Sequence, residues 1–285
     1  MTAVNTTVLP QETRIGRTAL HVSELEELTK FYRTVVGLSV LEKSDTRSVL
    51  GVADTPLLLL EGEADAFTRH RSGTGLYHIA FRVPSRGALG DALVRVRDHW
   101  QLGGASDHWV SEALYLTDPE GNGIEIYRNF PREDWPISED GTVRISTEPL
   151  ALDSIEAAAS GANQVPPGTD IGHVHLEVSS LSAFRDFYVD TLGFEVQTTV
   201  PAAAFVSAGG YHHHIGANTW HHRTNPVSGR GLSWFEVLVP ERESLDGVRE
   251  RLAAKGISLT VTDDGLVVHD PDEIEVRIRV DSSDQ

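Results

Sequence analysis

The sequence predicts an α+β fold made of four similar βαβββ units. An internal repeat is the first observation behind this prediction: residues 15–40 return as residues 171–196, and residues 75–84 return as residues 231–240, both 156 positions later. The second is periodicity, because within each half apolar residues first alternate and then recur at three- and four-residue spacing, as in a strand followed by an amphipathic helix. The third is that turn residues divide the chain after each helix into short strands.

The first unit shows how these elements follow from the residues. Residues 15–22 alternate as a strand, Ser23 can cap the helix that follows, and Gly37 ends that helix. The helix carries its apolar side chains at Leu25, Leu28, Phe31, Tyr32 and Val35. Strands are expected near 38–42, 47–52 and 56–61.

The other units repeat this order. The second unit begins at Leu76, contains a helix near 86–99 and closes on a strand at 124–129 after the turn DPEGNG. The third and fourth units run from about 171 to 220 and from about 231 to 280.

The chain is predicted to divide into two modules of two units each. The first module covers residues 10–130 and the second covers residues 170–282. Residues 131–169 contain PREDWPISEDGT and a run of small residues, so they are predicted to form a linker with one helical turn.

Composition limits both the chemistry and the partners. Asp and Glu outnumber Lys and Arg by 42 to 24, and the net charge of −18 argues against nucleic acid or an anionic membrane as a partner. The N-terminal residues lack an apolar signal segment, and no later stretch has the roughly 18 apolar residues of a membrane span, so we expect a cytoplasmic protein. The absence of cysteine restricts any metal site to nitrogen and oxygen ligands.

Three motifs carry a resemblance to a known family. A strand with His in its third place, a helix ending FYxxxLGF and a closing turn DPxGNxIE resemble the vicinal oxygen chelate superfamily, which includes glyoxalase I, fosfomycin-resistance enzymes and extradiol dioxygenases. More narrowly, GLYHIAFRVP, DHWVSEALYLTDPEGNGIEIY, IGHVHLEV and SAGGYHHHIGANTW resemble bacterial two-module catechol 2,3-dioxygenases. The resemblance spans nearly the whole chain. It implies curved mixed sheets that enclose cups, with a metal on the concave side.

The resemblance implies metal ligands at the third residue of each unit's first strand and at a Glu of the closing strand. In chain order these positions hold Arg17, His78, Glu125, His173, Trp234 and Glu275. Pairing units one with two, or three with four, would leave each site short of a ligand. We therefore predict that units two and three share a metal site, whereas units one and four form a metal-free cup in which Arg17 faces Trp234.

A fourth ligand is expected in the histidine-rich stretch YHHHIG at 211–216. If this stretch is a strand and Ile215 faces the core, alternation places His212 and His214 toward the cavity and His213 toward the core. The predicted metal ligands are then His78, Glu125, His173 and His214, with His212 close by as a catalytic residue. A facial triad needs only two histidines and one carboxylate, and the sequence leaves open which histidine is spare. A histidine cluster without a ligand is the alternative.

Two further residues are candidates for acid–base chemistry. His108 stands before the strand that leads to Glu125, where the resembling dioxygenases place a polar active-site group, and Tyr115 alternates toward one face of the sheet. A His or Tyr beside the metal could take a proton from a catechol and return it later.

The remaining polar candidates are predicted to be structural. Tyr32 and Tyr188 lie on helix faces and are expected in the core, Glu275 is expected in the metal-free cup, and His221 and His222 are expected at the surface.

The resemblance implies an oxidoreductase of the catechol 2,3-dioxygenase type that acts in aromatic compound catabolism. The two hydroxyl oxygens of a small aromatic diol would chelate Fe(II), and O₂ would bind beside them. Mn, Ni or Zn is the alternative metal, and an isomerase or glyoxalase-like enzyme is the alternative activity, because four protein ligands would suit such a site. A metal-free small-molecule binding protein is the third possibility, and a homo-oligomer is left open.

Overall fold

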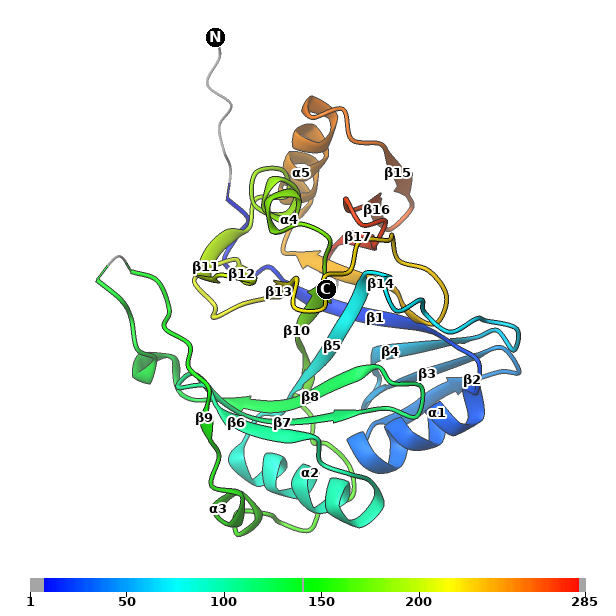
Figure 1. Cartoon of the computed structure of the whole chain (residues 1–285), viewed down its shortest axis with the longest axis vertical. Helices are drawn as coiled ribbons and strands as arrows, with labels where there is room; N and C mark the ends of the chain where they lie inside the picture. The colour runs from blue at the N-terminus through cyan, green and yellow to red at the C-terminus, as the bar shows by residue number, and fades with distance from the viewer. Residues whose placement is uncertain (1–7, 140, 282–285) are drawn as a thin grey trace.

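The computed structural model describes residues 8–139 and 141–281, and over these residues the chain forms two mixed sheets with helices packed against them (Figure 1). Among the described residues, one sheet has eight strands in the order β15 (Leu259–Thr262), β16 (Gly265–His269), β17 (Glu275–Val280), β14 (Gly231–Val239), β1 (Arg14–Val22), β4 (Thr55–Gly62), β3 (Arg47–Val52) and β2 (Ser39–Lys43). The other, again over the described part of the chain, has nine strands in the order β11 (Glu195–Val200), β12 (Ala203–Ser207), β13 (Ile215–Asn218), β10 (Asp170–Glu177), β5 (Gly75–Arg82), β8 (Gly123–Asn129), β7 (Ser111–Thr117), β6 (Gly104–Asp107) and β9 (Glu148–Pro149). The predicted α+β fold is confirmed.

Each sheet combines one unit from each half of the chain. In the eight-stranded sheet, β1 of the first unit pairs antiparallel with β14 of the fourth. In the nine-stranded sheet, β5 of the second unit pairs antiparallel with β10 of the third. The predicted pairing of unit two with three, and of one with four, is therefore confirmed.

The helices, in contrast, are grouped by half. In Figure 1, α1 (Leu25–Phe31) and α2 (Arg86–His99) lie in the lower part of the molecule, and α4 (Leu181–Tyr188) and α5 (Arg242–Ala254) lie in the upper part. Each half thus keeps its helices together, while its strands are divided between two sheets.

A buried tyrosine–aspartate pair ties the two units of each half together. The Tyr32 hydroxyl donates to Asp118 Oδ2, and the Tyr188 hydroxyl donates to Asp270 Oδ2; each donor–acceptor distance is 3.0 Å. Both tyrosines are fully buried, which confirms their predicted place in the core. Each pair links the helix of one unit to the closing turn of the next.

The first helix ends as predicted but begins differently. After α1 the chain continues as a single π-helical turn, Tyr32–Val36, which ends at Gly37 in the left-handed region (φ 93°) that glycine favours. Ser23 does not cap α1, so that expectation was wrong. Its hydroxyl donates instead to Glu120 Oε1 at 2.9 Å, which joins the first unit to the closing turn of the second.

Residues between the two halves pack onto the second unit. Trp135 and Val143 form a small apolar cluster with Val110. After a 3₁₀ turn, Arg132–Asp134, and the short helix α3 (Leu152–Glu156), the backbone N–H groups of Ser160 and Gly161 donate to Asp91, each over 2.7 Å. The division into 10–130, 131–169 and 170–282 stays a prediction, and each sheet takes strands from both modules.

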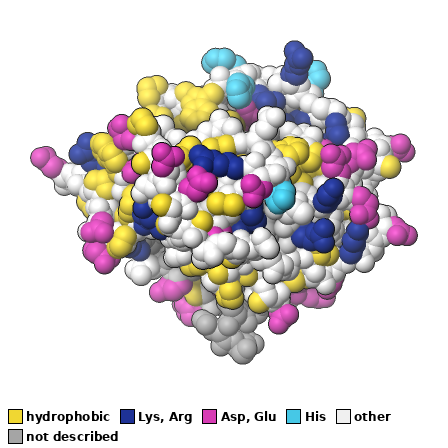
Figure 2. Space-filling model, turned by 90° about the horizontal axis from the view of Figure 1, so that it is seen from below, with side chains coloured by type: hydrophobic (Ala, Val, Ile, Leu, Met, Phe, Trp, Pro, Cys, Tyr) yellow, Lys and Arg dark blue, Asp and Glu magenta, His cyan; other side chains and the backbone are white. Residues whose placement is uncertain are grey.

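No helix in the described part of the chain is long and apolar enough to cross a membrane. On the face shown in Figure 2, acidic and basic side chains are interspersed, and no single basic field covers it.

Candidate metal centre

Three neighbouring strands of the nine-stranded sheet position three of the four predicted ligands. His173 on β10 lies opposite Ala80 on β5, and Ala80 lies opposite Glu125 on β8. His78 precedes Ala80 by two residues, so its side chain points to the same face of the sheet. The small Ala80 leaves the space between these three side chains open.

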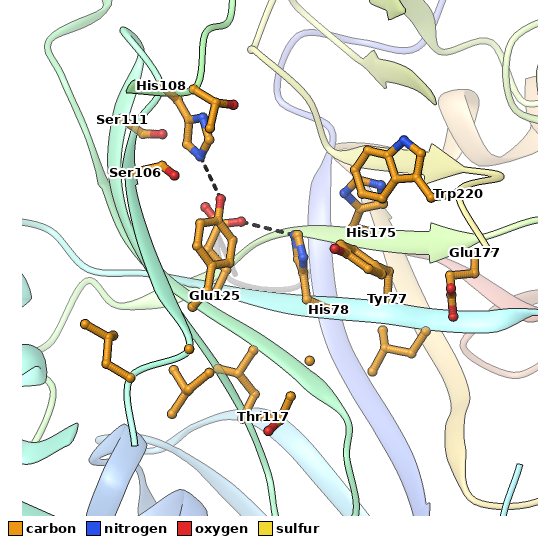
Figure 3. A pocket seen from close by; sticks show the side chains of 18 of the residues that line it. Tyr77, His78, Ser106, His108, Ser111, Thr117, Glu125, His175, Glu177 and Trp220 are labelled. Atoms are coloured by element: carbon orange, nitrogen blue, oxygen red, sulfur yellow. Dashed lines mark hydrogen bonds and ion pairs between the residues drawn. The ribbon is translucent and has the colours of Figure 1, made fainter. Parts of the chain in front are cut away.

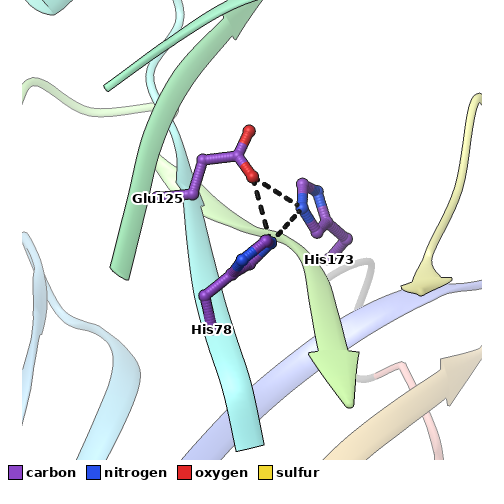
Figure 4. A group of neighbouring side chains, drawn as sticks. All are labelled: His78, Glu125 and His173. Atoms are coloured by element: carbon purple, nitrogen blue, oxygen red, sulfur yellow. Dashed lines mark hydrogen bonds and ion pairs between the residues drawn. The ribbon is translucent and has the colours of Figure 1, made fainter. Parts of the chain in front are cut away.

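The ligand atoms of these residues converge on one point (Figure 4). Glu125 Oε2 lies 3.1 Å from the Nε2 atoms of both His78 and His173, and the two Nε2 atoms lie 3.2 Å apart. For metal–ligand bonds of about 2.1 Å, such spacings subtend about 95° at the ion, whereas tetrahedral ligands would lie about 3.4 Å apart. The three atoms thus fit adjacent corners of an octahedron.

The protonation states of the cluster also suit a metal. Burial opposes ionisation of Glu125, yet the two histidines, His173 foremost, hold the pKa of its carboxyl well below the usual value. Burial lowers the pKa of His173 despite the neighbouring carboxylate. An ionised carboxylate beside a neutral imidazole is the form in which both residues bind metals. The donor set of two imidazoles and one carboxylate therefore fits a divalent ion such as Fe(II).

His108 and Tyr115 lie on one side of this cluster and contact each other. The ring nitrogen Nδ1 of His108 is 2.5 Å from the carbonyl oxygen of Ser146, which can only accept, so the proton belongs on Nδ1. His108 Nε2 then accepts from the Tyr115 hydroxyl at 2.7 Å. Burial, followed by the negative charge of Glu125, raises the pKa of Tyr115 well above its usual value. Tyr115 therefore stays protonated and acts as a donor.

The stretch 211–214 is not a strand, so the alternation used to orient its histidines does not apply. Strand β13 begins only at Ile215. His214, the predicted fourth ligand, is stacked on Tyr211, and its Nδ1 accepts a bond from the Ala208 N–H at 3.2 Å. The structure does not bring it to the cluster. His213, expected to face the core, lines the cavity with its ring centroid 4.0 Å from that of His173.

His212 also lines the cavity, and its hydrogen bonds orient His213. Asn129 donates through Nδ2 to the Tyr211 hydroxyl, so its Oδ1 accepts from His212 Nε2. Each of these donor–acceptor distances is 3.0 Å. His212 Nδ1 therefore has no proton and accepts from His213 Nδ1 at 2.8 Å. The unprotonated nitrogen of His213 is then Nε2.

Comparisons with known proteins agree with this geometry. The family model described as Glyoxalase/Bleomycin resistance protein/Dioxygenase superfamily matches residues 14–126 and 170–278. The chain belongs to this superfamily. It is 39% identical to a Bacillus subtilis (strain 168) protein named catechol-2,3-dioxygenase, over 93% of this chain and 96% of that one. It is 28% identical to biphenyl-2,3-diol 1,2-dioxygenase 3 of Rhodococcus globerulus, over 49% of this chain and 80% of that one.

Solved structures show the same superfamily fold at low identity. A putative dioxygenase from Bacillus subtilis matches with a TM-score of 0.65 and 15% identity, over 97% of this chain and 87% of that one. Glyoxalase I from Zea mays matches with a TM-score of 0.58 and 15% identity, over 94% of this chain and 92% of that one.

The second cup of the superfamily fold lacks the ligands, as predicted. Arg17 and Trp234 occupy the positions of His173 and His78, and the Arg17 guanidinium carbon lies 5.8 Å from the Trp234 ring. The strand register corrects one assignment: Glu236 takes the place of Ala80 and pairs with Arg277, so Arg277 and not Glu275 is the counterpart of Glu125. This part of the second cup therefore holds two guanidinium groups and an indole.

A cavity of about 1360 Å³ opens beside the His78–Glu125–His173 cluster. Figure 3 shows His108 and Ser106 on one side of His78, and His175 and Trp220 on the other. His221, expected at the surface, is exposed, but its Nδ1 also contacts Glu177 Oε1 at 2.5 Å on the cavity wall.

Sequence reasoning missed His175, which is buried and lines this cavity. The signal was present in the motif IGHVHLEV. Because His175 follows His173 by two residues on one strand, both rings point to the same face.

Proposed function

We propose that this protein is an extradiol ring-cleaving dioxygenase that opens a catechol-type diol with O₂ and uses Fe(II) held by His78, His173 and Glu125. The observation that carries the proposal is the cluster of two imidazole nitrogens and one carboxylate oxygen, 3.1–3.2 Å apart. A ferrous ion held there would supply the open positions at which a diol and O₂ meet. The 39% identical relative named catechol-2,3-dioxygenase supports the same reaction class.

The residues around the cluster can carry the protons of this reaction. Both atoms of O₂ enter the product, so no external reductant is needed, but the diol must release a proton as it binds. His213 Nε2 is an unprotonated nitrogen beside His173, and burial lowers the pKa of the His213 ring. We assign His213 as the proton acceptor and His212 as the residue that fixes its orientation.

Tyr115 and His108 form the second group, and the Tyr115 ring centroid lies 5.8 Å from that of His78. The Tyr115 hydroxyl is held by His108, which is held in turn by the Ser146 carbonyl. Because the Tyr115 hydroxyl has a single proton, it can donate to a substrate oxygen that gains negative charge only by releasing His108 Nε2. The catalytic residues proposed from the sequence, His108, Tyr115 and His212, thus all belong to two hydrogen-bonded groups at the cavity.

The rival activity, a metal-dependent isomerase, was favoured by a fourth protein ligand. His214, the residue assigned to that place, bonds to the Ala208 N–H and does not join the cluster. Three ligands with neighbouring open positions support the dioxygenase proposal.

Metal analysis and a substrate panel test the proposal. Protein purified without added metal is analysed for its elements, reloaded anaerobically with Fe(II), and assayed for O₂ uptake with several catechols. We expect one O₂ consumed per diol and a yellow ring-opened product. If no catechol is oxidised, while Ni- or Zn-loaded protein isomerises a hemithioacetal, the rival activity is correct. A protein that binds no metal but binds small molecules would contradict both.

A further inference from the structure

His175 takes no part in the metal cluster or in the two proton-handling groups, yet it occupies the cavity wall beside them. It is buried, and its ring centroid lies 4.9 Å from that of His78. Tyr77 and Trp220 border it at 5.0 and 5.5 Å. His175 therefore joins the cluster to an aromatic wall on the side of the cavity opposite His108 (Figure 3).

The hydrogen bonds of Asn218 assign the tautomer of His175. The backbone N–H of Trp220 can only donate, and it donates to Asn218 Oδ1 at 3.1 Å. Asn218 Nδ2 must then face His175 Nε2, 3.1 Å away, and this amide nitrogen can only donate. His175 Nε2 is thus an acceptor, and the neutral ring carries its proton on Nδ1. Among the described residues, none is hydrogen-bonded to that Nδ1.

The second cup shows that the fold does not need a histidine here. Ala19 occupies the position of His175, 156 residues earlier, and its neighbour on the next strand is Leu59. His175 instead has Gly216 as its neighbour. A Cβ on Gly216 would lie 3.0 Å from His175 Nδ1, so glycine makes the room that the ring occupies. In the second cup the sizes are exchanged: the small Ala19 stands at the position of His175, and the large Leu59 stands at the position of Gly216.

We propose that His175 contacts the substrate, donating from Nδ1 to an oxygen on a planar substituent of the diol, which lies along the wall of Tyr77 and Trp220. This inference rests on the proposed function and names the substituent class: an acyl or carboxylate group. The far end of the wall favours the same class. Arg69 and Arg223 both pair with Glu177, which leaves one net positive charge there.

The test compares two catechols that differ in one atom of the substituent. Acetylcatechol carries a carbonyl oxygen where isopropenylcatechol carries a CH₂ group, and both substituents are planar. Comparing wild type and variant as a ratio of kcat/KM for the two removes the difference in intrinsic reactivity. In His175→Phe we expect this acetyl-to-isopropenyl ratio to fall about tenfold, the worth of one hydrogen bond.

Two further variants guard against a simple loss of packing. His175→Ala copies the second cup, where Ala19 is tolerated. Asn218→Asp keeps an acceptor for the Trp220 N–H but can only accept from His175 Nε2, so in the neutral ring the proton moves from Nδ1 to Nε2 and Nδ1 becomes an acceptor. We expect the ratio to fall at least as far in Asn218→Asp as in His175→Phe. Ala19→Ser in the second cup is the matched control and should keep the wild-type ratio.

The same ratio is measured without O₂ as calorimetric affinities for metal-loaded protein, so the inference is judged even if no catechol is cleaved. Suppose that neither catechol is cleaved, yet wild type binds acetylcatechol more tightly than isopropenylcatechol and His175→Phe loses this preference. The proposed function is then overturned, and the role of His175 stands. An unchanged ratio in His175→Phe and Asn218→Asp, or an equal loss for both catechols, would overturn the role of His175.

Discussion

The two sheets of this protein have the same architecture but opposite contents at their centres. In the nine-stranded sheet, Ala80 leaves space between two histidines and a glutamate whose ligand atoms converge. In the eight-stranded sheet, the counterpart of Ala80 is Glu236. Its carboxylate accepts hydrogen bonds from Arg17 and Arg279, with donor–acceptor distances of 2.5–2.9 Å. The converging nitrogen and oxygen atoms suit a bound cation, whereas Glu236 is neutralised by arginines of the protein. Because the eight-stranded sheet forms without these three residues, the fold does not depend on the candidate metal site.

Removing a ligand is the strongest way to test this difference. We expect Glu125→Ala and His173→Ala to abolish catechol oxidation and to weaken metal binding by more than about 100-fold. Losing a residue that only hydrogen-bonds to a metal ligand costs up to about 100-fold, and losing the ligand itself should cost more. The measurement is metal content after dialysis, with circular dichroism to show that the fold is kept. Arg277→Ala, at the position of Glu125 in the second cup, is the control and should retain metal. Loss of metal from Arg277→Ala would show that the second cup, and not the His78–Glu125–His173 cluster, binds the metal.

Replacing Tyr115 tests the proton-handling group with a smaller expected effect. Tyr115 lies opposite Glu125 on the neighbouring strand, and Val267 lies opposite Arg277 in the same way in the second cup. Tyr115→Phe removes only the hydroxyl, so kcat should fall about 100-fold, within the range of acid–base contributions. Steady-state O₂ uptake and metal analysis decide the matter: metal loss in the variant would show a structural role instead.

Glu236→Ala gives the second cup the residue that its counterpart Ala80 has in the nine-stranded sheet, and it should affect stability alone. It leaves two half-buried guanidinium groups without their partner, which we expect to cost about 1–3 kcal/mol in the free energy of unfolding at pH 7. Burial opposes ionisation of Glu236, but the Arg17 bonds hold the pKa of its carboxyl below the usual value. A lowered pKa stabilises the fold above the unfolded pKa of about 4.3, and this is lost as the pH falls through the folded value.

Urea denaturation at pH 7 and near pH 3 measures this effect. The difference in the free energy of unfolding between wild type and Glu236→Ala should be smaller near pH 3 than at pH 7. A gap of the same size at both pH values would mean that the charge of Glu236 does not matter.

A pH effect of the opposite sign is expected at the tyrosine–aspartate pairs that tie each half. Burial raises the pKa of Asp270 to about 7, and it also raises the pKa of Asp118. A raised pKa stabilises the fold below the unfolded value of about 3.9, and this is lost as the pH rises through about 7. Asp270→Asn cannot ionise, so its stability relative to wild type should improve between pH 5 and pH 8. Denaturation at both pH values checks this, and a relative decline would contradict it.

Sequence patterns alone were enough to predict the architecture and the three residues of the candidate metal site. A repeat of 156 residues, strand and helix periodicities, and the loss of one ligand from each half sufficed to predict four units and their pairing across halves. His78, Glu125 and His173 follow from the same motifs. Such features are local patterns or spacings, and side-chain direction on a regular strand follows from its period of two.

Irregular segments and strand register could not be predicted and became visible only in the folded structure. Residues 211–214 lie outside β13, so alternation could not show that His213 lines the cavity while His214 points away. Likewise, Arg277 was identified as the counterpart of Glu125 by strand register, which the similar letters of the two closing turns concealed. The tautomers of His175 and His213 depend on Asn218 and Asn129, which are distant in sequence. Such contacts arise from the packing of separate strands and leave no local pattern to read.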